Sequence, residues 1–229
     1  MKRLAIFAEG LTETIFIQKL IEEIGTKHEM AFETRALVGT TFTIMQSPTV
    51  IPGQTNIYVL LVNCNNDERV KSVVLDQRKS LQQAGYHLIV GLRDLYPSAL
   101  SDLLLIESRL SYGVPTKGIP TRLFLSVGEV EAWFVQEHTH FARIHVDFTN
   151  DYIRQLTGFD INTQTADSIE QPSKMLDQIY SSRGLRYAKK RRQLQRTVAA
   201  IDYAELYLCG AAKLPHLAKF ISCIEGAVL

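Results

Sequence analysis

Short apolar runs alternate along this chain with longer segments of helical periodicity, and that alternation most constrains the fold. Apolar runs cover residues 4–8 and 57–63, further strand-like segments cover 32–38, 87–92 and 122–127, and helical patterns cover 12–24, 67–84 and 98–112. Strands that are apolar along most of their length are typical of sheets buried on both faces. Strands that alternate with helices predict an α/β fold, with a mainly parallel sheet flanked by helices.

The last third of the chain has a different pattern. Beyond about residue 145 the apolar runs lose strand character, and helices are expected over 151–156, 173–180, 185–201 and 204–224. We therefore expect an α/β core of residues 1–145 and a helical extension of residues 146–229 packed on it. Residues 39–56 are rich in Gly, Pro, Ser and Thr and are expected to form one long loop.

Composition excludes several classes of protein. The 25 Lys and Arg residues balance 24 Asp and Glu, which excludes both a general polycation and a disordered acidic chain. No window approaches the roughly 18 consecutive apolar residues of a membrane span, and no targeting signal precedes the first strand. The cysteines Cys64, Cys209 and Cys223 are widely spaced, fit no zinc pattern and suit a reducing compartment. These features predict a cytoplasmic protein with no membrane partner.

Acidic residues follow three of the predicted strands. Glu9 comes directly after the first, Asp94 ends the segment 87–94, and Glu129 and Glu131 follow the strand 122–127. Parallel sheets bind ligands at the carboxyl ends of their strands, and carboxylate oxygens are ligands for Mg²⁺. The four acids are therefore candidate metal ligands, for Mg²⁺ or Mn²⁺. The structural alternative is that they are loop acids or acids at helix N-termini.

Three segments resemble a known family. Residues 6–13, Ile-Phe-Ala-Glu-Gly-Leu-Thr-Glu, resemble the opening of Toprim-related domains, and residues 90–97 resemble their second motif. Residues 128–134, Gly-Glu-Val-Glu-Ala-Trp-Phe, resemble the Glu-Ala-Trp motif of a Toprim-like family of unknown function. Residues 171–176 and 187–189 also match the C-terminal region of that family.

The resemblance implies a Rossmannoid, Toprim-like fold and a metal-dependent nuclease site, as in OLD-family nucleases. Glu9 would be the first acid, a metal ligand or general base, and Asp94 would bind the metal. Glu129 and Glu131 would be the next ligands. The family is often encoded near ATPases in bacterial defence loci, so the resemblance implies an anti-phage effector with an ATPase partner.

One position departs from the family pattern. The second motif usually carries another acid two residues after the first, and Tyr96 stands there. A phenol is a poor Mg²⁺ ligand at neutral pH. Glu129 or Glu131 completes the site, or the site is weakened, or the protein keeps the fold as a catalytically inactive subunit that binds nucleic acid or a partner. A doubly wound phosphotransferase is a third reading, because fold does not fix function.

A basic run marks the C-terminal part. Residues 183–196 hold seven Lys and Arg residues and no acid. A cationic stripe of this kind contacts phosphates without reading bases; the alternatives are a solvated helix face or an acidic partner. Helical spacing would place Arg186, Lys189, Lys190 and Gln193 on one face. The predicted nucleic-acid-binding residues are Lys174, Arg186, Lys189, Lys190 and Arg192. The sequence leaves the oligomeric state open and allows a homo-oligomer.

Three smaller features have mainly structural interpretations. Trp133 is expected to pack in the core rather than stack on a base. His138, His140 and His145 lack further spaced ligands, so an exposed polar turn is favoured over a zinc site. Asn66 or Asp67 is expected to cap the helix that follows.

Overall fold

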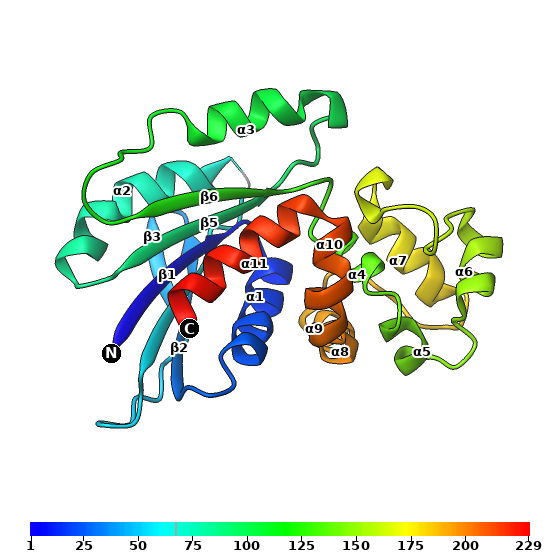
Figure 1. The fold of residues 1–229 in the computed structure, drawn as a ribbon, viewed down its shortest axis with the longest axis horizontal. Coiled ribbons are helices and arrows are strands. Elements are labelled where there is room, and N and C mark those ends of the chain that lie inside the picture. Colours follow the sequence, from blue (N-terminus) through cyan, green and yellow to red (C-terminus); the bar gives the residue numbers. More distant parts are fainter. Residues whose placement is uncertain (67) are drawn as a thin grey trace. The chain divides into compact units, whose positions relative to one another are not determined.

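The structure is a computed structural model that describes residues 1–66 and 68–229. It confirms the α/β class: one six-stranded sheet, mostly parallel, is flanked by helices, and the C-terminal region is helical (Figure 1). The strands are β1 Lys2–Ala8, β2 Met30–Val38, β3 Thr41–Gln46, β4 Ile57–Asn63, β5 Leu88–Asp94 and β6 Thr121–Ser126.

The α-helices range from single turns to segments of 15 residues. They are α1 Leu11–Ile24, α2 Arg69–Gln83, α3 Leu103–Ser111, α4 Glu131–Gln136, α5 His140–Ile144, α6 Asn150–Thr157, α7 Pro172–Ser181, α8 Arg191–Ala200, α9 Tyr203–Glu205, α10 Ala211–Lys213 and α11 Pro215–Val228. Two 3-10 turns, Leu100–Asp102 and Ala166–Ser168, and one π-helical turn, Leu206–Gly210, complete the helical segments. Within the described residues, no helix combines the length and apolarity needed to cross a membrane.

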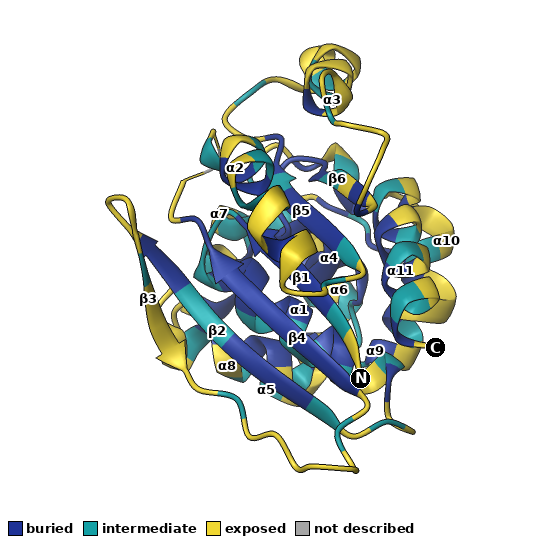
Figure 2. Cartoon of the chain, turned by 90° about the vertical axis from the view of Figure 1, so that its left-hand side faces the viewer, coloured by how far each residue is buried: buried dark blue, intermediate teal, exposed yellow. Residues whose placement is uncertain are grey.

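The strand order in the sheet is β3-β2-β4-β1-β5-β6. Strand β1 runs parallel to both β4 and β5, and β2 runs parallel to β4. Strand β3 is an antiparallel edge strand, so the prediction of one unbroken loop over residues 39–56 was wrong. The sequence hid this strand because β3 is mostly exposed and lacks an apolar run (Figure 2). Gly39, at φ +61°, makes the tight turn that returns the chain from β2.

The contacts between residues divide the chain into two compact units. Unit 1 contains residues 1–93, 104–125 and 222–229, and unit 2 contains residues 94–103 and 126–221. This division differs from the predicted boundary at residue 145. The segment 126–145 belongs with the later helices because Trp133, Phe134 and Phe141 are fully buried in unit 2. The last residues return to unit 1, where Val228 approaches Gly25.

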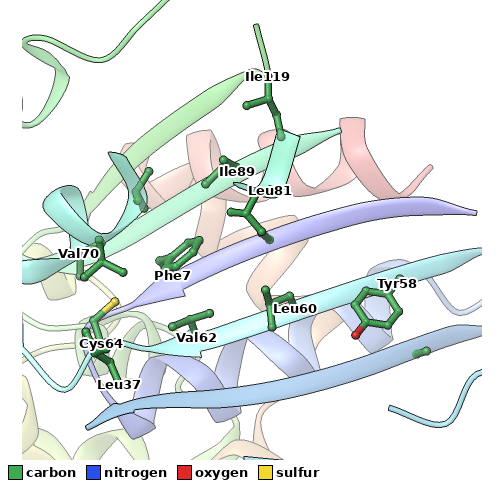
Figure 3. Packing of buried hydrophobic residues seen from close by; sticks show 14 residues of the cluster. Phe7, Leu37, Tyr58, Leu60, Val62, Cys64, Val70, Leu81, Ile89 and Ile119 are labelled. Atoms are coloured by element: carbon green, nitrogen blue, oxygen red, sulfur yellow. The ribbon is translucent and has the colours of Figure 1, made fainter. Parts of the chain in front are cut away.

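Unit 1 is built around the apolar sheet. Phe7, Leu60 and Val62 lie on one face, where α2 contributes Val70 and Leu81 (Figure 3). Helix α1 contacts β4 and β1 from the opposite face (Figure 1). Strand β4 is buried along its whole length, which explains its continuous apolar sequence. Each large apolar side chain buried in this way contributes about 1.5–3 kcal/mol.

The start of α2 lies near the one residue outside the described chain. The predicted cap at Asp67 falls on that residue. The cap predicted at Asn66 was wrong: Glu68 precedes the helix and has no side-chain capping hydrogen bond, and Asn66 instead accepts a hydrogen bond from the Glu68 amide at 2.8 Å.

Candidate functional site

Three of the predicted acids come together in unit 2 around one lysine. We call Asp94, Glu129, Glu131 and Lys189 the carboxylate–lysine cluster. Asp94 is the last residue of β5, Glu129 follows β6, and Glu131 begins α4. The exposed fractions of Asp94, Glu129 and Glu131 are 4%, 6% and 0%. Three buried carboxylates in one unit need compensating charge or protons.

Lys189 supplies that charge. Its Nζ lies 2.9 Å from Oε1 of Glu129 and 3.1 Å from Oε1 of Glu131. The Lys189 side chain is 41% exposed along its length, while its ammonium is held by the carboxylates. Burial disfavours the charged ammonium, but Glu131 and Glu129 outweigh it, and the pKa of Lys189 is raised; Asp94 adds to that rise. Lys189 therefore stays protonated between the two glutamates.

Lys189 lies in an ordered loop before α8. Its backbone φ is +53°, a left-handed conformation that is uncommon for a residue other than glycine. Neighbouring residues fix the loop: the amide of Tyr187 donates to Asp177 at 2.8 Å, and that of Ala188 donates to Gln193 at 2.7 Å. Backbone outliers of this kind concentrate at functional sites, where the surrounding structure maintains them.

The side chain of Glu129 lies against the first turn of α7. Its oxygens accept hydrogen bonds from the backbone amide and the hydroxyl of Ser173, both at 2.9 Å. Gly128 makes this approach possible: its φ is +69°, and a side chain there would lie 3.3 Å from the Ile169 carbonyl oxygen. Burial opposes the charge of Glu129, but Lys189 and the Ser173 hydrogen bonds prevail and lower its pKa. Glu129 is thus held as a carboxylate.

The pKa of Glu131 is shifted in the opposite direction to that of Glu129. Glu131 is fully buried, and Oε1 accepts hydrogen bonds from the Tyr187 hydroxyl at 2.9 Å and from Lys189. Its other oxygen, Oε2, is buried with no hydrogen-bond partner among the described residues. Burial raises the pKa of Glu131, and Lys189 only partly opposes it. Two neighbouring carboxyl groups with opposite pKa shifts are typical of acid–base pairs.

Asp94 connects the ends of the two strands. Its Oδ1 accepts a hydrogen bond from the Ser126 hydroxyl and another from the Val130 amide at 3.0 Å. Tyr96, which replaces the expected second acid, is 39% exposed, and its amide donates to the Gly128 carbonyl oxygen at 2.8 Å. Asp94 therefore fixes the loop that carries Glu129 and Glu131.

Glu9 belongs to unit 1 and follows the last residue of β1. Ala8 pairs with Leu92 in the parallel ladder, so Glu9 lies at the carboxyl edge of the sheet, as predicted. Glu13, in the first turn of α1, is also buried there, at 3% exposed.

The basic residues separate into two groups. The prediction of a helix over 185–201 with Arg186, Lys189 and Lys190 on one face was wrong, because α8 begins only at Arg191. Arg186 lies 3.7 Å from Asp177, and Lys189 is held by the glutamates. The exposed residues Lys174, Lys190, Arg191 and Arg192 have side chains without an ion-pair partner among the described residues.

The other aromatic and histidine predictions have mixed outcomes. Trp133 is fully buried, with its ring 5.7 Å from that of Phe220, which confirms the core interpretation. The exposed-turn prediction was wrong for His140, which is fully buried. Its Nε2 lies 3.3 Å from the Tyr180 hydroxyl, and its Nδ1 lies 2.5 Å from the Glu137 carbonyl oxygen.

The sequence reasoning missed two residues that donate hydrogen bonds to the glutamates: Ser173, which donates to Glu129, and Tyr187, which donates to Glu131. Both lie in segments that matched the family resemblance, but nothing in their spacing assigned them to Glu129 and Glu131. Among residues 1–66 and 68–229, no group of three or more His, Cys, Asp or Glu side chains is arranged to hold a metal ion. Comparison of the chain with protein-family models, curated proteins and solved structures finds no match.

Proposed function

We propose that the protein is a metal-dependent nuclease that hydrolyses phosphodiester bonds, of the Toprim-like type that the sequence motifs resemble. The observation that carries this proposal is the carboxylate–lysine cluster. Asp94, Glu129 and Glu131 follow two strands of a mainly parallel sheet and gather around one ammonium in unit 2. The carboxyl ends of parallel strands are where this class of fold binds ligands.

The donor atoms are of the type that a hard divalent cation such as Mg²⁺ or Mn²⁺ prefers, but the described residues do not arrange three of these carboxylates as a metal-binding group, and the Lys189 ammonium lies between Glu129 and Glu131. All of the ligating atoms would be carboxylate oxygens, and the buried Oε2 of Glu131 has no hydrogen-bond partner among the described residues. Asp94, Glu129 and Glu131 would hold the ion, and the family resemblance assigns Glu9 the role of the first acid. A bound divalent cation would lower the pKa of water and neutralise charge on the phosphodiester.

The protein groups have separate roles in this proposal. Glu129, which its lowered pKa keeps ionised, can hold a cation, while Glu131, whose pKa is raised, takes up a proton more readily. Lys189 compensates the charge of Glu129 and offers an ammonium to a phosphate oxygen. Lys174, Lys190 and Arg192 are exposed and contact the nucleic-acid backbone, with the neighbouring Arg191 as a further contact.

The alternative is a catalytically inactive subunit that binds nucleic acid or a partner protein. Two observations favour it. Tyr96 stands where the family has a second acid, and the Lys189 ammonium already compensates Glu129 and Glu131. A role as a cytoplasmic anti-phage effector with an ATPase partner belongs to the proposal in either form, and rests on the resemblance.

A nuclease assay separates the two forms. The purified protein is incubated with plasmid, linear DNA and tRNA in the presence of Mg²⁺, Mn²⁺ or EDTA. Glu9→Ala tests the unit 1 acid. Asp94→Asn and Glu131→Gln change charge at nearly constant shape, and the exposed Asp151→Asn is the matched control.

The nuclease proposal predicts cleavage that requires metal. It should fall by about 10²–10³-fold in Glu9→Ala, Asp94→Asn and Glu131→Gln, and persist in Asp151→Asn. Equal cleavage by all variants would identify a contaminant. Binding of nucleic acid without cleavage under every metal condition would select the inactive subunit.

A further inference from the structure

A second site lies in unit 1, on the face of the sheet next to α2. A cavity of about 300 Å³ opens there, near the lower end of the range for small-molecule sites. Its charged and aromatic lining residues include Arg3, Glu33, Arg35, Phe42, Tyr58 and Tyr86. We infer that this cavity binds a small aromatic carboxylate, a flat molecule of one or two rings with a single negative charge.

The charges of the cavity leave one cation in excess. Two arginines face one glutamate, which gives a net charge of +1. Glu33 is only 6% exposed, and it accepts hydrogen bonds from the Tyr58 hydroxyl and from Nε of Arg35. The carboxylate of Glu33 is therefore engaged with Arg35 and Tyr58 rather than with Arg3.

Arg3 is held ready to bind an anion. Its guanidinium carbon lies 5.0 Å from the ring centre of Tyr58 and 5.1 Å from that of Tyr86, and Nη1 donates to the Ala84 carbonyl oxygen. Its Nε is buried with no hydrogen-bond partner among the described residues. A buried charged donor without an acceptor is costly, so an acceptor supplied by a ligand would be favourable.

The remaining walls suit a flat ring. Phe7, Leu60 and Val62 form an apolar floor on this face of the sheet, as Figure 3 shows. Phe42 reaches the cavity from the edge strand β3 and is only partly buried. Tyr86 closes another side. Aromatic walls favour stacked or edge-to-face contacts with a ring.

A carboxylate fits this cavity better than a phosphate monoester. A single negative charge matches the net charge of +1, whereas a dianion would face the buried carboxylate of Glu33. Like charges at short distance in a partly buried site are destabilising. The guanidinium groups can also donate two parallel hydrogen bonds to a planar carboxylate.

Calorimetric titration with three probes tests this inference. The probes are naphthalene-2-carboxylate, its neutral carboxamide, and 2-naphthyl phosphate. We expect the carboxylate to bind with a Kd of about 0.1–1 mM, and the other two to bind at least about tenfold more weakly. Equal binding of carboxylate and carboxamide, tighter binding of the phosphate, or no binding of the carboxylate would each overturn the inference.

Protein variants locate the probe. Ser80 is an exposed residue of α2 that lines the cavity, so Ser80→Trp should fill the opening and abolish binding. Ser72→Trp, on the same helix outside the cavity lining, is the matched control and should bind normally. Arg3→Met should weaken binding about tenfold or more. Arg35→Met gives a second charge test at a side chain that is 38% exposed, with folding checked by thermal unfolding. Normal binding in a folded Ser80→Trp or Arg35→Met protein would contradict the site.

Discussion

The two units of this protein bury very different interiors. Unit 1 surrounds a sheet whose central strand β4 is buried and almost entirely apolar. Its buried ionisable side chains are few, chiefly Glu13 and Glu33. Unit 2 also has an apolar core, around Trp133 and Phe134, but it buries more titratable groups. Those groups are Asp94, Glu129, Glu131, Glu137 and His140.

This difference separates two sources of stability. Apolar burial depends little on pH or salt, because it removes hydrocarbon surface from water. A buried charged group is tolerated only while its partner stays in place and in the right protonation state. Unit 1 should therefore respond mainly to losses of volume, and unit 2 mainly to losses of a charge partner or a proton.

The largest effect is expected in the core of unit 1. Phe7→Ala removes a ring that is 1% exposed and leaves a cavity beneath α2, so it should lower the free energy of unfolding by about 3–5 kcal/mol. Urea unfolding at pH 6 and at pH 8 measures this loss, which should be equal at the two values. Ile44→Ala, at a side chain that is 56% exposed, should change it by under about 0.5 kcal/mol. A loss for Phe7→Ala that depends strongly on pH would contradict the comparison.

The next effect concerns the charge balance of unit 2. Lys189→Met leaves Glu129 and Glu131 facing each other without a cation. Breaking a fully buried pair costs about 3–5 kcal/mol, and the partial exposure of Lys189 reduces our expectation to about 2–3 kcal/mol. Hydrogen exchange over residues 126–137 and 185–192 should locate the loss in unit 2.

A double variant tests the cause of that loss. Lys189→Met with Glu131→Gln removes both members of one pair but leaves Glu129 without its cation, so it should recover only part of the stability lost in Lys189→Met. If the losses of the two single variants simply add, the ammonium does not stabilise the cluster by charge compensation.

A third effect follows from His140. Burial lowers the pKa of this imidazole to about 4, from an unfolded value near 6.5. Between these values the unfolded chain binds a proton that the folded chain does not, so stability falls as the pH falls from about 6.5 to 4. The expected contribution is about 2–3 kcal/mol over that range.

His140→Gln isolates this contribution from other titrating groups. The raised pKa values of Glu131 and Glu137 act in the opposite direction, since those groups bind protons more readily in the folded chain. The stability difference between the protein and His140→Gln should narrow as the pH falls through this window, measured by urea unfolding. A constant difference would show that His140 titrates normally.

How far the sequence could predict the structure also differs between the units. In unit 1, short strand-like segments correctly predicted β1, β2, β4, β5 and β6, and the signal is clearest in β1 and β4, which are buried along most of their length. Strand β3 was missed since it is mostly exposed and is held mainly by its pairing with β2. Exposed edge strands carry little periodic signal.

In unit 2, the candidate acids were predicted but their partners were not. Glu129 and Glu131 were selected by their place after a strand, a local property of the sequence. Lys189 lies 60 residues from Glu129, and only the folded loop before α8 brings the two charges together. That long separation also explains why the sequence assigned Lys189 to a helix face. The burial of His140 was missed for a similar reason, because its neighbour Tyr180 lies 40 residues away in the sequence.

The smallest effect on stability is expected at the exposed cations of α8. Lys190 precedes the first turn of this helix, where positive charge opposes the helix dipole. Lys190→Glu should therefore leave the free energy of unfolding unchanged or raise it by up to about 1 kcal/mol.

Under the proposed function, the same variant should weaken DNA or RNA binding several-fold at low salt and reduce the salt dependence by about one counterion. Lys27→Glu, an identical charge change at an exposed position of unit 1, is the control in filter-binding titrations. Equal weakening by both variants would mean that net charge alone governs binding, whereas weakening by Lys190→Glu alone places the phosphate contacts on unit 2.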